Sequence, residues 1–312
     1  MPRFGYERVM VRSRIRPVAA AAAVVVVAAA VTTACAGVPA QERTAVPSQT
    51  AIPSPATGPR YVAMGDSAAA APLVPQQAAP TGCLKSTNDY PSVLARRIGA
   101  ASFRDATCSG ARTEDLLSRA QSTRSGDVPP QLDAVEPDTE LVTITIGGND
   151  VDLPAHAMAC RRISLDVPPC SSALVAGGVD AISRAIDEEA GKWSALVGAV
   201  RAKAPDARVI VVGYGTYVRP EGCFPTQPIN PVDAAYFQAK LDELDRRLER
   251  VAAGRGAEFF DTRPLSVGHD ICAAPQDRFI EGFAPTSPAA PLHPNGVGAA
   301  AVGAALADYV AR

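Results

Sequence analysis

The tripeptide Gly65-Asp66-Ser67 is the first place in the chain where residue types suggest chemistry. It follows a short apolar segment, residues 60–64. A serine hydroxyl is a weak nucleophile until a base takes its proton, so Ser67 would need a partner. Gly65 permits a tight turn, and the N–H groups at the start of the next helix could stabilise an oxyanion. Asp66 is expected to be a structural hydrogen-bonding residue, and the tripeptide alone is more often an ordinary turn.

Three histidines are available as the base. His293 lies in the sequence Leu-His-Pro-Asn-Gly, just before the last expected helix, and its loop could reach the end of a sheet. His269 lies three residues before Cys272, so a structural position in a disulfide-held loop would account for this histidine. His156 lies in a proline-containing loop. We therefore predict that His293 is the base. The alternative is a histidine at a helix start with no partner.

Two further motifs offer hydrogen-bond donors. Asn149 lies in the sequence Gly-Gly-Asn-Asp after the strongly apolar segment 141–146, and its side-chain amide could donate to a developing oxyanion. Gly110 follows Cys108-Ser109 and precedes an expected helix, so its N–H is another candidate donor. The competing interpretations are an Asn-Asp turn that caps a helix and a simple turn glycine.

The elements that would position these residues alternate along the chain. Strands are predicted at residues 60–64, 102–106, 141–146, 208–212 and 257–260. Helices are predicted at residues 91–98, 112–120, 172–203 (interrupted at Gly177-Gly178), 231–253 and 296–311. This alternation predicts a three-layer α/β/α sandwich with a central, mostly parallel sheet. Ligands bind such sheets beyond the carboxyl ends of the strands, where the motifs lie.

In this order, the four motifs resemble those of the SGNH (GDSL) hydrolase family, over residues 60–312. The resemblance implies a flavodoxin-like SGNH hydrolase fold and a carboxylic ester hydrolase that needs no cofactor. It further implies that Ser67 is the nucleophile and His293 the general base. The Ser67 and Gly110 amides and the Asn149 side chain would form the oxyanion hole.

One position departs from the family pattern. Many members carry an acid three residues before the histidine, and here that residue is Ala290. We expect the main-chain carbonyl of Ala290 to accept a hydrogen bond from His293 Nδ1, as in some disulfide-bearing relatives. A neutral carbonyl still fixes the tautomer, although it stabilises an imidazolium less than a carboxylate does. The other acids considered for this role are Asp261, Asp270 and Asp277.

The cysteines indicate a disulfide framework. Apart from Cys35 there are six, and an even number in an exported domain indicates three disulfides with 15 possible pairings, or else buried free thiols. Pairing sequence neighbours is one solution. The layout resembles the secreted, three-disulfide bacterial esterases and lipases of the SGNH family, which implies this local pairing: Cys83–Cys108, Cys160–Cys170 and Cys223–Cys272.

The N-terminus predicts export. Residues 1–35 read as a signal peptide, with a basic start followed by an apolar run at 18–31, and an uncleaved anchor helix is the alternative. Cys35 resembles a lipoprotein processing site, which would tether the protein to the outer face of the plasma membrane, whereas cleavage near Ala36 or Ala40 would release it. Residues 36–59 are proline-rich and predict a disordered linker before the domain at 60–312.

Composition narrows the partners. A net charge of −2 leaves no basic excess for nucleic acid, and the three scattered histidines form no metal motif. The predicted substrate is a lipid acyl ester, in a pocket lined by residues 68–75 and 279–292, and the protein is expected to be a monomer. The alternatives are a carbohydrate O-acyl esterase of the cell envelope, an acyltransferase and a non-catalytic envelope-binding protein.

Overall fold

The computed structural model describes residues 57–312. The predicted signal peptide, the possible lipidation site at Cys35 and nearly all of the predicted linker lie outside these residues. The first strand, β1 (Gly58–Gly65), begins two residues before the expected start of the domain. Gly58 pairs with Ala100 of the neighbouring strand, so residues 58 and 59 belong to the sheet and not to the linker.

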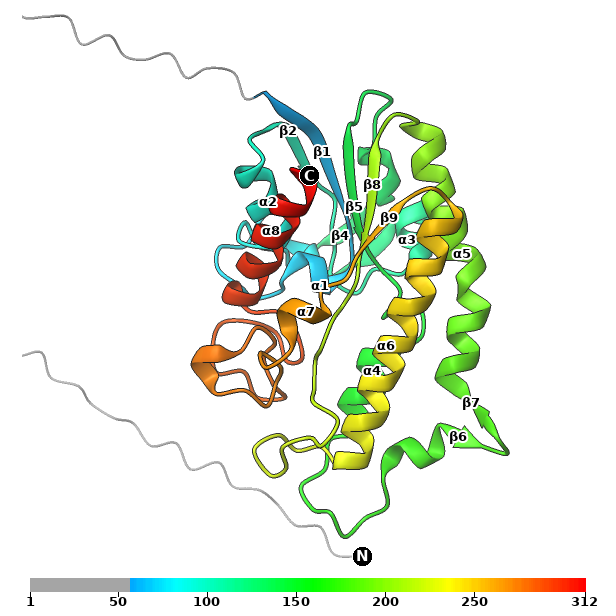
Figure 1. Ribbon diagram of the computed structural model, residues 1–312, viewed down its shortest axis with the longest axis vertical. Coiled ribbons are helices and arrows are strands. Elements are labelled where there is room, and N and C mark those ends of the chain that lie inside the picture. The colour runs from blue at the N-terminus through cyan, green and yellow to red at the C-terminus, as the bar shows by residue number, and fades with distance from the viewer. Residues whose placement is uncertain (1–56) are drawn as a thin grey trace, which may run out of the picture. The chain divides into compact units, whose positions relative to one another are not determined.

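The core of the molecule is a five-stranded parallel sheet in the order β2-β1-β5-β8-β9 (Figure 1). The other four strands are β2 (Ala100–Asp105), β5 (Leu141–Thr145), β8 (Arg208–Val212) and β9 (Glu258–Phe260). Every pair of neighbours in this sheet is parallel. The carboxyl ends of all five strands therefore meet at one edge, where the sequence predicts that the candidate motifs lie.

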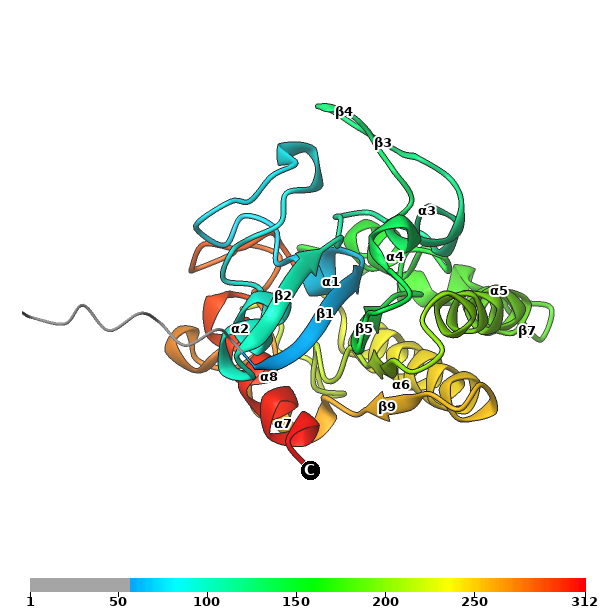
Figure 2. The same ribbon diagram turned by 90° about the horizontal axis from the view of Figure 1, so that it is seen from above.

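Helices cover both faces of the sheet (Figure 2). Successive side chains of a strand point to opposite faces. On β1, Tyr61 and Ala63 pack in one buried cluster with α2 (Tyr90–Arg97) and α8 (Gly296–Val310). Val62 and Met64 pack in another cluster with the helices of the opposite layer, α3 (Thr113–Leu117), α5 (Ala181–Lys203) and α6 (Pro231–Gly254). The predicted three-layer α/β/α fold is confirmed.

The long helix predicted over residues 172–203 is wrong in its first part. Residues 170–180 instead form a short 3-10 helix and a two-stranded hairpin, which turns at Gly177-Gly178. Helix α5 starts only at Ala181, because the Asp180 side chain accepts hydrogen bonds from the N–H groups of the second and third helical residues. The hairpin strands are β6 (Val175–Ala176) and β7 (Val179–Asp180).

A second hairpin was not predicted. Helix α3 ends at Leu117, and the chain then forms β3 (Gln121–Thr123) and β4 (Gly126–Val128). The remaining short helices are α1 (Ser67–Ala70), α4 (Leu153–Ala159), α7 (Arg263–Ser266) and the 3-10 segments Thr81–Cys83, Gln131–Ala134, Cys170–Ala173 and Pro275–Asp277.

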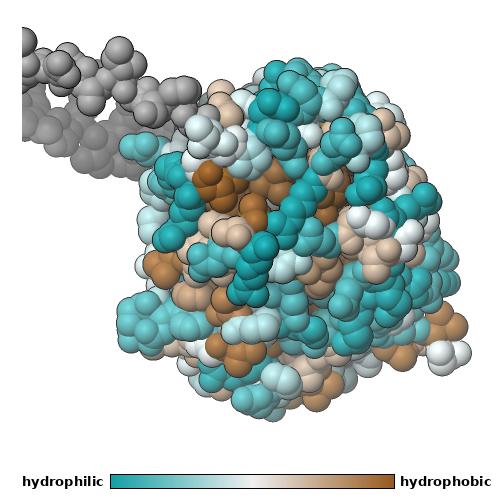
Figure 3. Space-filling model, turned by 45° about the horizontal axis from the view of Figure 1, so that its top comes forward, coloured by the Kyte–Doolittle hydropathy of each residue, from teal (hydrophilic) through white to brown (hydrophobic). Residues whose placement is uncertain are grey.

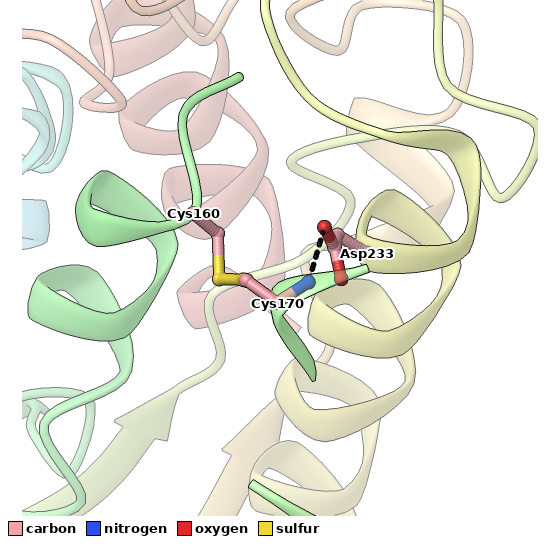
Figure 4. Close-up of side chains that lie close together, drawn as sticks. All are labelled: Cys160, Cys170 and Asp233. Carbon is pink, nitrogen blue, oxygen red and sulfur yellow. Dashed lines mark hydrogen bonds between the residues drawn. A yellow bond between two sulfur atoms is a disulfide. The ribbon is translucent and has the colours of Figure 1, made fainter. Parts of the chain in front are cut away.

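All three disulfides implied by the family resemblance are present: Cys83–Cys108, Cys160–Cys170 and Cys223–Cys272. Figure 4 shows the second of them beside Asp233, whose carboxylate accepts hydrogen bonds from the N–H groups of Cys170 (3.1 Å) and Ser171 (2.9 Å). Because both sulfur atoms are in the disulfide, this cluster is a brace between α4 and α6 and offers no thiolate ligands.

The surface of the described part is mixed. The face shown in Figure 3 is mostly hydrophilic, and its hydrophobic patches are small and separate. In residues 57–312 we find no helix with the length and hydrophobicity needed to cross a bilayer.

Candidate active site

The turn after β1 presents Ser67 at the carboxyl edge of the sheet. Gly65 has a φ of +154°, and a Cβ there would lie 2.6 Å from the carbonyl oxygen of Thr145, so only glycine fits. Asp66 caps α1, because its carboxylate accepts a hydrogen bond from Ala68 N at 2.8 Å. Ser67 is consequently the first residue of α1, which fixes its backbone.

The predicted base lies beside this serine. His293 Nε2 is 2.7 Å from Ser67 Oγ, although the two residues are 226 positions apart in the sequence. His293 Nδ1 lies 2.7 Å from the carbonyl oxygen of Pro291, which can only accept, so Nδ1 carries the proton and Nε2 faces the serine with its lone pair. Burial lowers the pKa of the imidazole, and the hydrogen bond to Pro291 only partly opposes this shift. The ring is therefore neutral at neutral pH.

The expected role of Ala290 is wrong. The carbonyl that orients His293 belongs to Pro291. Ala290 is instead fixed by its own N–H, which donates to the carbonyl of Pro72 at 2.9 Å. Leu292 adopts a φ of +58°, and the reversal of the chain there directs the carbonyl two residues before the histidine towards Nδ1.

Glu281 anchors the histidine loop and is not among the site residues predicted from the sequence. Its buried carboxylate accepts hydrogen bonds from Ser287 Oγ (2.6 Å), Thr286 N (2.7 Å) and Asn295 Nδ2 (2.9 Å), and its main-chain N–H donates to the carbonyl of His293 at 2.9 Å. Burial alone would raise the pKa of this carboxyl, but the hydrogen bonds outweigh it and lower the pKa. A lone acid in the apolar run Phe-Ile-Glu-Gly-Phe was the available signal.

The predicted oxyanion donors lie near the serine turn to different degrees. Asn149 lines the same pocket as Ser67 and His293. One N–H of its side-chain amide donates to the carbonyl of Ala111 at 3.0 Å, and this hydrogen bond fixes the direction of the second N–H of the amide. Gly110 does not line this pocket. It has a φ of +81° and follows Cys108, whose N–H donates to the carbonyl of Gly65 at 3.0 Å. Among the hydrogen bonds within residues 57–312, none uses the N–H of Ser67 or Gly110.

Tyr214 joins the serine turn to the asparagine loop. Its hydroxyl donates to Asp66 Oδ2 at 2.5 Å and accepts from Gly148 N at 2.9 Å. Burial raises the pKa of Asp66 to about 7, although the hydrogen bonds from Tyr214 and Ala68 oppose the shift. Asp66 is thus the structural residue that the sequence predicts, and the tyrosine is an additional contact that no motif indicated.

Asp150 holds the other side of the same loop. Its carboxylate accepts hydrogen bonds from Thr113 N (2.8 Å), Thr113 Oγ1 (2.6 Å) and Trp193 Nε1 (2.9 Å). These bonds connect the loop after β5 to α3 and α5. The two neighbouring residues therefore differ in role, since Asn149 lines the pocket whereas the Asp150 carboxylate bonds to α3 and α5.

The pocket beside Ser67 contains about 760 Å³ of empty space, part of it open to solvent. Its wall comes mainly from α4, α6 and the loop after β8, and is predominantly apolar: Leu153, Pro154, Ala157, Tyr217, Val218, Ile229, Phe237, Leu241, Ile271, Phe283 and Leu292. The predicted wall at 68–75 is wrong except for Ala68, because Ala71 and Val74 are buried against Ala289 and Ala299. From residues 279–292, Phe283 and Leu292 contribute as expected.

The other titratable candidates have structural partners. His269 Nδ1 lies 2.6 Å from the carbonyl of Asp277, and its ring stacks on Phe279 with centroids 4.0 Å apart. Asp261 pairs with Arg263, and Asp270 accepts a hydrogen bond from Cys272 N. Within the described residues none of these groups, nor His156, bonds to Ser67 or His293, which leaves His293 as the partner of the serine.

A hydroxyl bonded to a neutral imidazole, at the mouth of an apolar pocket on a parallel sheet, defines a serine hydrolase. Comparison with known sequences identifies the family of serine hydrolases. The profile of the GDSL-like lipase/acylhydrolase family matches residues 63–301, and the chain belongs to this family. It is therefore a carboxylic ester hydrolase.

Individual relatives agree with this assignment. Lipase 2 of Streptomyces coelicolor is 37% identical over 254 residues, which cover 76% of this chain and 81% of that protein. The crystal structure of an extracellular lipase from Streptomyces rimosus is 26% identical, with a TM-score of 0.66 over 81% of this chain and 99% of that one. A phospholipase A1 from Streptomyces albidoflavus shares the fold, with 24% identity, a TM-score of 0.67 and the same coverage.

Proposed function

We propose that this esterase cleaves lipid acyl esters through an acyl-enzyme on Ser67, with His293 as the general base. The observation that carries the proposal is the 2.7 Å contact between Ser67 Oγ and His293 Nε2 beside an apolar pocket. Neutral His293 is ready to accept a proton, because burial lowers its pKa. The Pro291 carbonyl holds the ring in the required tautomer.

The reaction follows from these positions. Ser67 Oγ attacks the ester carbonyl while its proton passes to His293 Nε2, and the carbonyl oxygen becomes an oxyanion. The free N–H groups of Ser67 and Gly110 and the second N–H of Asn149 are the proposed donors to that oxyanion. His293 then gives the proton to the leaving alcohol oxygen. Water repeats the sequence on the acyl-enzyme and releases the acid.

The pocket favours an acyl chain as the group beside the nucleophile. Its wall is formed mainly by aliphatic and aromatic side chains of α4, α6 and the loop after β8, which suit burial of a hydrocarbon. Relatives named as lipases agree with this choice. An acylated envelope glycan would instead require a row of polar contacts for the sugar.

Export is part of the proposal. The disulfides Cys83–Cys108, Cys160–Cys170 and Cys223–Cys272 are typical of an oxidising compartment, and a related lipase is described as extracellular. We propose secretion through the signal peptide at residues 1–35, with attachment through a lipidated Cys35 as the alternative. Mass spectrometry of the exported protein distinguishes the two, because lipidation adds the mass of the acyl groups at Cys35.

The experiment that tests the mechanism compares the exported protein with Ser67→Ala. We expect the unchanged protein to react with a fluorophosphonate probe and to cleave p-nitrophenyl esters, and the variant to do neither, because the nucleophilic oxygen is absent. Labelling that persists in the variant would contradict the assignment of Ser67. A series of acyl-chain lengths, with an alcohol added as competing acceptor, tests the lipid substrate and separates hydrolysis from acyl transfer.

A further inference from the structure

Exposed hydrophobic side chains are concentrated in one segment of the described chain. Eleven large hydrophobic side chains are exposed within residues 57–312, and six of them lie between residues 158 and 179, less than a tenth of that range. Single exposed apolar residues are normal, whereas a concentration marks an interaction site. We call residues 158–179 the apolar rim. Its exposed members are Met158, Ile163, Leu165, Val167, Val175 and Val179.

The apolar rim has a fixed backbone. It forms the lower end of the described part in Figure 1, between the end of α4 and the start of α5. The disulfide Cys160–Cys170 closes its main loop, and the Asp233 carboxylate binds the N–H groups at 170 and 171 (Figure 4). Arg162 N also donates to the carbonyl of Pro228 at 2.7 Å. These bonds fix the two ends of the loop that carries Ile163, whose side chain is 93% exposed.

The apolar rim is continuous with the catalytic pocket. It begins at Met158, directly after Ala157, which lines the pocket together with Leu153 and Pro154 on the same helix. On the far side it contacts the start of α6 through Asp233, and α6 supplies Phe237 to the pocket wall. A surface that bound the rim would therefore lie next to the pocket that contains the nucleophile.

The charges of the rim indicate the kind of surface. Its charged residues are Arg161, Arg162 and Asp166. Among the ion pairs of residues 57–312 none involves either arginine, and the Arg162 guanidinium donates only to main-chain carbonyls at 159 and 161. Two cations beside an exposed Ile163 suit a layer that has phosphates above hydrocarbon, because arginine stems can lie along the apolar region while the guanidinium remains at the phosphates.

We propose that the apolar rim docks the enzyme on a phospholipid surface, with Ile163, Leu165 and Val167 among the acyl chains and Arg161 and Arg162 at the phosphates. The proposal rests on the proposed lipid substrate and adds a binding step before an ester enters the pocket. A symmetric contact between two copies would bring the arginines of both copies together with a single acid from each, which disfavours a dimer.

The test measures flotation of the exported full chain with vesicles of phosphatidylcholine and phosphatidylglycerol. All proteins carry Ser67→Ala, which prevents hydrolysis, and Cys35→Ser, which prevents lipid attachment. Ile163→Glu is compared with Val267→Glu, because Val267 is 67% exposed but follows α7, away from the lower end in Figure 1. We expect Ile163→Glu to bind about tenfold more weakly and Val267→Glu to bind like the parent, since only Ile163 would leave water on binding.

A second set of variants tests whether the two arginines bind lipid phosphates. Arg161→Gln and Arg162→Gln should each weaken binding about fivefold on vesicles with phosphatidylglycerol, and much less on phosphatidylcholine alone. Equal binding of Ile163→Glu and Val267→Glu would overturn the proposal. So would sedimentation velocity in which Ile163→Glu converts a dimer of the parent into a monomer, because the rim would then be a contact between copies.

Activity measurements separate this proposal from the proposed function. With Ser67 intact, Ile163→Glu should retain the kcat/KM of the parent on a soluble p-nitrophenyl ester and lose about tenfold on esters in vesicles, by the same apolar burial. If Ile163→Glu and Val267→Glu both cleave vesicle esters like the parent, the proposed docking through the apolar rim is wrong, whereas the proposed hydrolysis of lipid esters is supported. If the parent floats with vesicles but releases no fatty acid from them, docking stands and the lipid substrate is wrong.

Discussion

The proposed nucleophile and the proposed base are positioned in different ways. Ser67 follows β1 and starts α1, so regular structure and the close approach of Gly65 to Thr145 fix it. His293 lies in an irregular loop that is held by the Pro291 carbonyl and by the buried carboxylate of Glu281. The position of Ser67 thus depends on the sheet, whereas the position of His293 depends on a small polar network. We therefore expect the position of Ser67 to tolerate substitutions nearby, and call it the robust half of the site. The position of His293 should be disturbed by the loss of a single polar contact, and we call it the sensitive half.

The largest effect should come from the donors on the side of the serine. Asn149→Ala removes a proposed oxyanion donor and should lower kcat about 10²–10³-fold with little change in KM, because the amide acts mainly on the transition state. The measurement is steady-state hydrolysis of a p-nitrophenyl ester, with thermal unfolding as a check on the fold. An unchanged kcat would remove Asn149 from the site.

The next effect tests the sensitive half. Glu281→Gln replaces an acceptor of several hydrogen bonds by an amide whose N–H groups face other donors, so the free energy of unfolding at pH 7 should fall by about 1–3 kcal/mol. Because the folded pKa of Glu281 is lowered, its stabilisation exists above the ordinary glutamate pKa of about 4.3 and is lost as the pH falls through the folded value. The difference in unfolding free energy should therefore shrink in acid.

Glu258→Gln is the matched control for that prediction. Glu258 pairs with Arg208 at a partly exposed position of the sheet, away from both catalytic residues. Surface ion pairs contribute at most about 1 kcal/mol, so this variant should change unfolding little and kcat not at all. If Glu258→Gln destabilises the protein as much as Glu281→Gln, the contrast between the two halves is broken.

A smaller effect should separate two tyrosines of the pocket. Tyr214→Phe removes the hydroxyl that joins Asp66 to Gly148 and should lower kcat about tenfold at constant KM, because the aromatic wall remains while the serine turn and the asparagine loop lose their connection. Tyr217 lines the same pocket, and its hydroxyl makes no hydrogen bond among the described residues. Tyr217→Phe should therefore retain the parent kcat, and equal losses in the two variants would exclude a positioning role for Tyr214.

The smallest effect concerns the missing acid of the family pattern. Ala290→Asp restores an acid three residues before His293, but the carbonyl of Pro291 already accepts from Nδ1. We expect kcat/KM to change by less than about threefold, since no hydrogen bond is gained. A large increase in kcat/KM, together with a higher apparent pKa in the acid limb of the pH profile, would show that a carboxylate at 290 reaches the imidazole.

The sequence predicted those parts that depend on periodicity and local motifs. The five strands of the parallel sheet and the helices α2, α6 and α8 lie within a few residues of their predicted positions, because apolar runs and helix caps are local signals. The helix predicted from residue 172 failed at Gly177-Gly178, where two glycines with positive φ form a hairpin that competes with the helix.

The site was predictable to the level of its motifs. Ser67, His293 and Asn149 line one pocket as expected, whereas the orienting carbonyl was assigned one residue too early. Which carbonyl faces Nδ1 depends on the positive φ of Leu292, and which acid is buried under the loop depends on packing around Glu281. Neither property is encoded in a short pattern, because the partners of Glu281 lie up to 14 residues away and the N–H of Ala290 bonds to Pro72, far earlier in the chain.

The separation of 226 positions between Ser67 and His293 has a consequence for synthesis. Ser67 leaves the ribosome early, whereas His293 precedes only α8, which packs on α2 across one face of the sheet. A nascent chain, or one that ends before residue 293, carries the serine without a group to take its proton. The proposed nucleophile and the proposed base are therefore both present only after nearly the whole domain has been synthesised.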